Sequence, residues 1–225
     1  MTEVAANLAR VRARVPPGVT LVAVSKTQPA AAVRAAHAAG QRDFGENYAQ
    51  EWREKAAELV DLPDLVWHFI GALQTNKVKY LLPRPAPAAV PLPAARWVHT
   101  VDRLALGEEL SRRAAARGEA VRALVEVNVA GEASKAGCAP ADVPHLAEAL
   151  ARLPGLELRG LMCIPPTEGD PRRHFAALRA LRDGLGMPLP DLSMGMSGDY
   201  EDAIREGSTL VRVGTAIFGA RAMPR

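Results

Sequence analysis

The sequence predicts an α/β fold, a single-domain closed (β/α)8 barrel over residues 1–225 with one extra helix before the first strand. The first observation is a repeated rhythm, in which a short β-branched run precedes a longer run rich in alanine, leucine and charge. The second is the count of eight such runs, because strands that alternate with helices pair in parallel through right-handed crossovers. The length of 225 residues suits a closed barrel. No G-x-G-x-x-G follows any strand run, which argues against an open dinucleotide-binding sheet.

The expected strands are short and mostly apolar. They cover residues 19–24, 42–45, 66–71, 96–100, 121–129, 157–163, 192–196 and 210–213. Before the first of them, Val4, Leu8, Val11 and Val15 share one face of an amino-terminal helix. That helix has no continuous apolar core, so it does not read as a signal peptide.

Two helices have clear start and stop signals. Asp102 is expected to cap a helix over residues 103–117, which ends at Gly118. Pro140 opens another helix that ends near Arg152.

A proline-rich segment interrupts the rhythm at residues 83–93. Five of these eleven residues are proline, which excludes a helix. We expect a stiff, extended surface loop that leads to the next strand, and a proline-rich docking motif stays open as an alternative.

Composition restricts the class of protein. The chain is 48% hydrophobic and 24% charged, with a formal net charge of +3, and its basic residues are scattered along helices instead of forming a stripe. We therefore expect no nucleic-acid partner. No run reaches about 18 apolar residues, so no membrane span is expected. Two cysteines without a secretory signal suggest reduced thiols in the cytoplasm.

Lys26 is the first candidate functional residue. It comes directly after the buried run Leu21-Val22-Ala23-Val24-Ser25, and Pro29 opens the next helix. Barrels carry their active groups on the loops after the strands. Partial desolvation there favours the neutral amine that attacks a carbonyl and forms a Schiff base. A solvated surface lysine is the alternative.

The ends of the last two strands predict a phosphate site. Ser197 follows the seventh strand, while Arg212, Gly214 and Thr215 end the eighth. Loops after these strands commonly bind phosphate in barrels, and backbone N–H groups at a helix start face an anion. Arg212 is a fixed cation at the barrel mouth if its side chain points inward. The alternative to a phosphate site is that the glycines here only form structural turns.

Weaker candidates lie in two other segments. Glu46 or Asn47 can point into the barrel mouth, although Asn47 also suits a helix cap. His68, between two aromatic residues, fits a core position as well as a catalytic base. The histidines lack metal-ligand spacing, so no metal site is expected. Ser197 is not followed by the glycine of a nucleophile elbow, because Asp199 stands there.

Taken together, the segments resemble the pyridoxal phosphate homeostasis protein family, barrel-only relatives of the alanine racemase amino-terminal domain. The matching segments are residues 23–27, 44–48, 67–71, 74–77, 101–102, 127–129, 134–137, 159–162, 192–197 and 211–219. They run in order across nearly the whole chain. Two features depart from the family pattern: a long proline-rich loop at residues 83–93, and Gly198 where members often carry a polar residue.

The resemblance implies that the chain binds pyridoxal 5′-phosphate (PLP), a form of vitamin B6, as a Schiff base on Lys26. Arg212 would face the pyridine nitrogen. Since a guanidinium does not give up its proton, the ring would be a weak electron sink. Ser197, Gly214 and Thr215 would hold the phosphate, and Asn47 would line the ring. Roles for His68 and Met162 stay open.

The family implies PLP storage and delivery, with apo PLP-dependent enzymes as acceptors and no catalysis by the chain itself. The alternatives are a PLP-dependent amino-acid racemase and a Schiff-base aldolase. A racemase needs a second base opposite Lys26. In the racemases that base is a tyrosine from an additional β-domain, whereas this sequence ends at Arg225. Without that domain, a monomer is expected.

Overall fold

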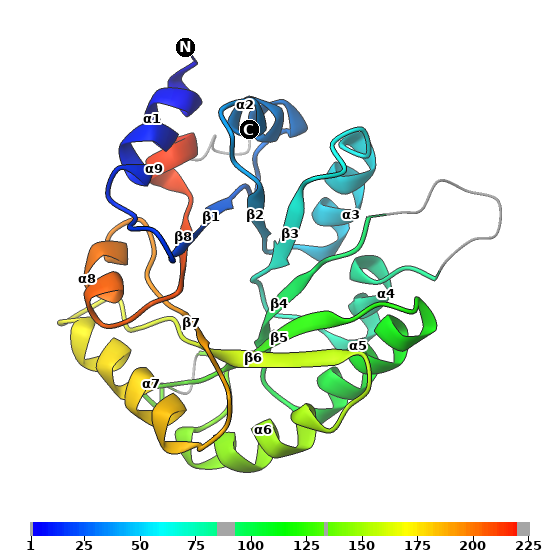
Figure 1. The fold of residues 1–225 in the computed structure, drawn as a ribbon, viewed down its shortest axis with the longest axis vertical. Coiled ribbons are helices and arrows are strands. Elements are labelled where there is room, and N and C mark those ends of the chain that lie inside the picture. Colours follow the sequence, from blue (N-terminus) through cyan, green and yellow to red (C-terminus); the bar gives the residue numbers. More distant parts are fainter. Residues whose placement is uncertain (1, 85–92, 133–134, 220–225) are drawn as a thin grey trace.

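Eight parallel strands close into one barrel in the computed structural model, which describes residues 2–84, 93–132 and 135–219 (Figure 1). The strands are β1 (Thr20–Val24), β2 (Asp43–Glu46), β3 (Val66–Phe69), β4 (Trp97–Val101), β5 (Val121–Glu126), β6 (Leu156–Met162), β7 (Asp191–Ser193) and β8 (Leu210–Val213). They pair in sequence order, and β8 pairs with β1 to complete the circle. The predicted barrel is therefore confirmed.

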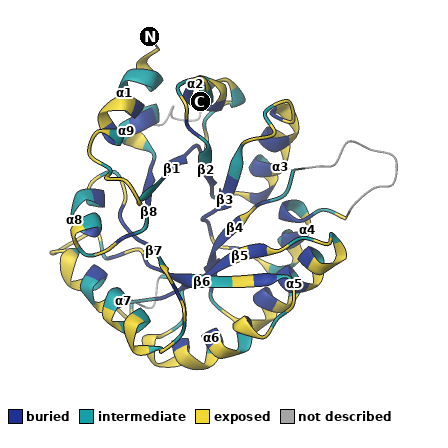
Figure 2. Ribbon diagram, in the orientation of Figure 1, coloured by how far each residue is buried: buried dark blue, intermediate teal, exposed yellow. Residues whose placement is uncertain are grey.

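Helices form a ring around the barrel (Figure 1). They are α1 (Glu3–Arg12), α2 (Ala30–Ala38), α3 (Ala49–Glu58), α4 (Val78–Leu81), α5 (Leu104–Ala116), α6 (Val143–Ala151), α7 (Arg172–Gly184), α8 (Tyr200–Arg205) and α9 (Thr215–Phe218), with short 3-10 turns at Thr75–Lys77 and Pro140–Asp142. The strands are largely buried, while the outer faces of the helices are exposed (Figure 2). The core therefore lies inside the barrel and between the barrel and its helices.

The amino-terminal helix α1 packs beside α9, the last helix of the described chain (Figure 1). Thr2 caps α1 by accepting the Ala5 N–H, and Asn7 donates from Nδ2 to the carbonyl of Ile217 at 3.1 Å. Leu8 and Val11 are buried, as the helical face predicted. The extra helix thus packs against the helix that follows β8, the strand that closes the barrel by pairing with β1.

The predicted cap at Asp102 is wrong. Helix α5 begins after Arg103, which has extended backbone and gives no side-chain cap. The Asp102 carboxylate accepts a hydrogen bond from the Arg103 guanidinium instead, at 2.5 Å. The predicted stop is right, because Gly118 adopts a φ of 65° that favours glycine.

The helix expected from Pro140 begins as a 3-10 turn, Pro140–Asp142. Its α-helical part is Val143–Ala151, which ends one residue before Arg152. Of the proline-rich segment, residues 85–92 lie outside the described residues.

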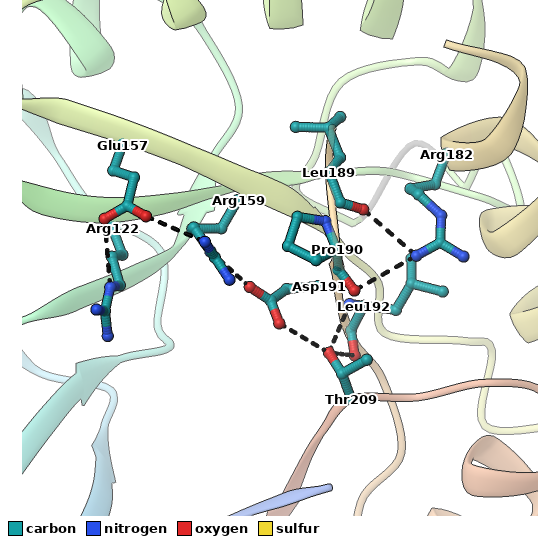
Figure 3. A network of polar contacts seen from close by, with 9 residues as sticks. All are labelled: Arg122, Glu157, Arg159, Arg182, Leu189, Pro190, Asp191, Leu192 and Thr209. Atoms are coloured by element: carbon teal, nitrogen blue, oxygen red, sulfur yellow. Dashed lines mark hydrogen bonds and ion pairs between the residues drawn. The ribbon is translucent and has the colours of Figure 1, made fainter. Parts of the chain in front are cut away.

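A polar network ties the amino ends of four strands together, at the end of the barrel opposite the predicted site (Figure 3). Glu157 contacts Arg122 at 3.3 Å and Arg159 at 3.1 Å, and Arg159 Nε contacts Asp191 Oδ2 at 2.8 Å. Thr209 Oγ1 donates to Asp191 Oδ1 at 3.2 Å. Residues at this end of a barrel serve stability, so these contacts support the frame on which the site is built.

Within the part of the chain that the structure describes, no helix is long and apolar enough to cross a membrane.

Candidate functional site

A cavity of about 270 Å³ opens at the carboxyl ends of the strands. This volume is near the small end of the range for ligand sites, roughly 300–1,000 Å³. The six site residues predicted from the sequence all line it: Lys26, Asn47, Ser197, Arg212, Gly214 and Thr215. Arg212 lies near the end of β8, and the other five come from the segments that follow β1, β2, β7 and β8, which explains how residues far apart in sequence meet.

Lys26 is half-buried, two residues beyond the end of β1. The next residue, Thr27, has a φ of 63°, in the left-handed region that β-branched residues rarely adopt. Its N–H donates to the Glu51 carboxylate on α3 at 2.5 Å. Backbone strain of this kind costs of order 1–3 kcal/mol and persists where surrounding contacts hold it, commonly at functional sites.

A buried ion-pair cluster lies beneath the Lys26 loop. Lys55 on α3 donates from Nζ to the Ser25 carbonyl at 2.8 Å, to Glu46 Oε1 at 2.6 Å and to Glu51 Oε1 at 2.9 Å. Ser25 Oγ also donates to Glu46 Oε1, at 2.7 Å. These three acceptors use all three N–H donors of the ammonium. Lys55 is therefore a structural cation, and it leaves Lys26 as the amine that lines the cavity.

Glu46 lies in this cluster and does not face the barrel mouth, which decides between the two positions left open in the sequence. Its side chain is fully buried, and burial raises the pKa of its carboxyl against the opposing effect of Lys55. Sequence reasoning missed Lys55. A glutamate and a lysine four residues apart on a helix usually form a solvated pair, so the pattern gives no sign of burial.

Asn47 is the residue of this segment that lines the cavity. It does not cap α3, because the residue at the cap position is Tyr48 and the helix has no side-chain cap. The buried Oδ1 of Asn47 has no hydrogen-bond partner within the described chain. Gly71 holds this segment closely, since a Cβ there would lie 2.1 Å from the Asn47 carbonyl oxygen. A residue of the cavity wall therefore carries a buried polar atom whose hydrogen-bonding capacity the described chain does not satisfy.

Arg212 points inward from β8 and is 4% exposed. Its Nη1 donates to Ser193 Oγ at 2.7 Å and its Nη2 to the Cys163 carbonyl at 3.0 Å. Both acceptors are uncharged, and burial lowers the pKa of the guanidinium. A desolvated cation thus forms part of the cavity wall.

The ends of β7 and β8 meet at the other side of the cavity. Ser197 Oγ accepts the Gly214 N–H at 3.2 Å. Gly214 lies at the start of α9, where a Cβ would be 3.3 Å from the Val24 carbonyl oxygen, and Thr215 is the exposed first residue of that helix. Gly198 also lines the cavity. Hydroxyl and backbone donors therefore gather where the sequence predicts a phosphate.

His68 and Met162 do not line the cavity. Met162 is fully buried and packs inside the barrel with Val22, Trp97 and Leu124, so it is a core residue. His68 is also fully buried, and its ring is hydrogen-bonded to Asp43 and to a second histidine.

Glu126, at the end of β5, provides a pH-dependence test. Burial and the nearby Asp102 raise the pKa of its carboxyl to about 7, against the attraction of Arg212. Because the unfolded chain releases this proton at lower pH, the contribution of Glu126 to stability falls as the pH rises from about 5 to about 8. The free energy of unfolding contributed by Glu126 decreases by roughly 3 kcal/mol over this pH range.

We therefore expect Glu126→Gln to gain stability relative to the wild type between pH 5 and pH 8. The measurement is urea unfolding of both proteins across that range. The rings of His68 and His99, whose pKa values burial lowers, give an opposite slope in both proteins, so the difference between the proteins isolates Glu126. The exposed Glu54→Gln is the control. A constant difference from pH 5 to pH 8 contradicts the prediction.

The chain is similar to known proteins over nearly its whole length. The alanine racemase, N-terminal domain model matches residues 1–222. A pyridoxal phosphate homeostasis protein of Pseudomonas aeruginosa is 53% identical over 98% of this chain and 97% of its own length. The protein of the same name from Escherichia coli K12 is 42% identical over 98% of both chains. The chain belongs to the pyridoxal phosphate homeostasis protein family.

Solved structures share the fold. PipY of Synechococcus elongatus, a structure with PLP bound, superposes with a TM-score of 0.86 at 41% identity, covering 96% of this chain and all of that one. Alanine racemase of Corynebacterium glutamicum superposes with a TM-score of 0.72 at 16% identity over 98% of this chain and 62% of that chain. The homeostasis protein family thus shares the barrel of the racemase, and at this identity the likeness extends to the fold alone.

Proposed function

We propose that this chain binds PLP covalently through Lys26 and serves PLP homeostasis as a carrier, not as an amino-acid enzyme. The observation that carries the proposal is the gathering of Lys26, the buried Arg212 and the Ser197–Gly214–Thr215 donors around one cavity. Relatives named for pyridoxal phosphate homeostasis and the PLP-bound PipY structure support it.

The residues fit the cofactor. PLP supplies an aldehyde that condenses with an amine, a pyridine ring and a phosphate tail. Lys26 is the amine at the cavity wall, and the hydrogen-bonded Lys55 is not a competitor. Ser197, Gly214 and Thr215 would hold the phosphate, and Arg212 would face the ring nitrogen. The unsatisfied Asn47 Oδ1 would meet the ring or its substituents.

The cavity supports a carrier better than a racemase. Racemisation needs two bases on opposite faces of the bound substrate. Among the residues that the structure describes, Lys26 and Arg212 are the ionisable groups of the lining, and none of the three tyrosines belongs to it. Tyr48 is exposed just before α3, Tyr80 lies among Arg53, Lys77 and Lys79, and Tyr200 is buried in the core.

We further propose a cytoplasmic monomer that shields the reactive aldehyde from scattered amines and passes the cofactor to apo PLP-dependent enzymes. Lys26 lies only partly buried in an open cavity, so an acceptor can approach its cofactor without unfolding the barrel.

The test is to soak the purified protein in PLP, remove the excess by gel filtration, and measure absorbance, amino-acid turnover and transfer to an apo-enzyme. We expect a retained near-ultraviolet or visible band, no conversion of D- or L-amino acids, and activation of the apo-enzyme. A colourless protein contradicts cofactor binding. Sustained turnover of an amino acid instead supports the racemase. A retained band without activation of the apo-enzyme contradicts the carrier role.

A further inference from the structure

A chain of hydrogen bonds runs through the interior of the barrel and ends at Arg212. Arg212 Nη1 donates to Ser193 Oγ at 2.7 Å, and Ser193 Oγ lies 2.9 Å from His99 Nδ1. His99 Nε2 lies 2.9 Å from His68 Nδ1, and His68 Nε2 lies 3.0 Å from Asp43 Oδ1. The five residues come from β8, β7, β4, β3 and β2, and the contact between His99 and Ser193 crosses the barrel between non-neighbouring strands.

When both rings are neutral, the Asp43 end of the hydrogen-bond chain fixes the direction of every bond in it, because a carboxylate only accepts. A guanidinium only donates, so Ser193 accepts from Arg212, and its one proton goes to His99 Nδ1, which carries none in this arrangement. His99 then carries its proton on Nε2 and donates to His68 Nδ1. His68 in turn donates from Nε2 to the Asp43 carboxylate, which only accepts.

This pattern requires both rings to be neutral, and their surroundings agree. His68 and His99 are fully buried, and burial lowers the pKa of both rings. In this arrangement each ring has one donor and one acceptor, both satisfied. Protonating either ring would set one N–H donor against another or leave the Ser193 hydroxyl without an acceptor.

Aromatic and charged side chains pack around the end of the hydrogen-bond chain that lies farthest from Arg212. The His68 ring stacks on Trp97 with centroids 5.5 Å apart and planes 8° apart. The Arg122 guanidinium lies 5.3 Å from the Trp97 centroid, and Arg122 also belongs to the network at the amino ends of the strands. Asp43 borders an open hollow at that end, with its side chain 30% exposed. The hydrogen-bond chain therefore connects the cavity to packed aromatic and charged side chains at the opposite end of the barrel.

We propose that Ser193, His99 and His68 are positioning residues, which hold the Arg212 guanidinium at the cavity wall through a one-directional hydrogen-bond chain anchored on Asp43. The inference rests on the proposed function only for the ligand that Arg212 contacts. The hydrogen-bond chain itself is a feature of the cofactor-free protein. A rigid cation already in place needs no reordering when a ligand binds.

The first test uses the cofactor-free protein. Nitrogen-15 NMR is expected to show both His68 and His99 as neutral rings protonated at Nε2. Relaxation of the Arg212 Nε–H is expected to report an ordered side chain. Protonation at Nδ1 in either neutral ring, or a charged ring at pH 7, overturns the assigned direction and with it the proposal. Neither readout depends on PLP, so failure of the proposed function does not affect this arm.

The second test compares variants of His99. His99→Leu removes both hydrogen bonds and should leave the Arg212 side chain mobile, whereas His99→Gln keeps one acceptor and one donor and should restore most of the order. Leu124→Ala is the control, because Leu124 is buried inside the same barrel but is apolar. Loss of Arg212 order in Leu124→Ala to the same degree would mean that general loosening explains the effect, which overturns the proposal.

The third readout is PLP affinity. We expect His99→Leu to weaken binding by about three- to tenfold, the effect expected when a hydrogen bond between uncharged groups is lost. In an Arg212→Leu background the same change should have less than about twofold effect, because residues that act through one another are not additive. Additive losses contradict the positioning role. If the wild type itself retains no PLP, the proposed function fails, and the order of Arg212 in the cofactor-free protein still decides this inference.

Discussion

Replacing Lys26 with alanine is expected to abolish covalent retention of PLP while leaving the barrel folded. Lys26 supplies the amine at the cavity wall, and the other lysine nearby, Lys55, is held by three acceptors beneath it. The side chain of Lys26 is half-buried in a loop, so its loss leaves the core intact. The measurement is the absorbance band that survives gel filtration after soaking in PLP, with the melting temperature as the check on folding.

The matched control is Lys79→Ala, which removes an exposed lysine on α4. It should retain the cofactor as the wild type does. A Lys26→Ala protein that still carries a band of wild-type intensity would place the attachment on another residue.

Replacing Lys55 with methionine is expected to destabilise the protein by about 3 kcal/mol or more. The change leaves the fully buried Glu46 without its cation, and removing one partner of a buried pair costs roughly 3–5 kcal/mol. For a protein of this size, the melting temperature should fall by roughly 6–12 °C. Glu51 and the Ser25 carbonyl lose the same partner, so the Lys26 loop should also take up PLP more slowly.

Two further variants test the cause. Lys79→Met makes the same substitution at an exposed position and should leave the melting temperature nearly unchanged. Adding Glu46→Leu to Lys55→Met should recover most of the stability, because an apolar pair replaces a buried ion pair at little cost. If the double variant is no more stable than Lys55→Met, the lost ion pair is not the cause of the destabilisation.

The barrel could be predicted because parallel strands buried on both faces appear as separate apolar runs. The carboxyl ends of the strands were less predictable. Strand β5 ends at Glu126 instead of the predicted residue 129, and β7 ends at Ser193 instead of Met196. Val127 and Met194 are buried by loop packing, and a hydrophobic residue in a buried loop looks the same in sequence as one in a strand.

The place of the six residues in the cavity lining could be predicted because each lies at or just beyond the end of a strand, and strand ends converge in a barrel. The residues that support them could not. Ser193 and His99 lie within strands, 94 residues apart in the sequence. Neither local sequence indicates that the two side chains meet across the barrel. Lys55 lies on a helix whose pattern suggests a surface position. Long-range contacts of this kind depend on the closed fold and not on any local pattern.

The most direct test of the account is to load the protein with PLP, fix the linkage with borohydride and map the modified peptide by mass spectrometry. The account predicts one dominant adduct, on Lys26. An unmodified Lys26 peptide, with the adduct on another lysine or on none, would contradict it.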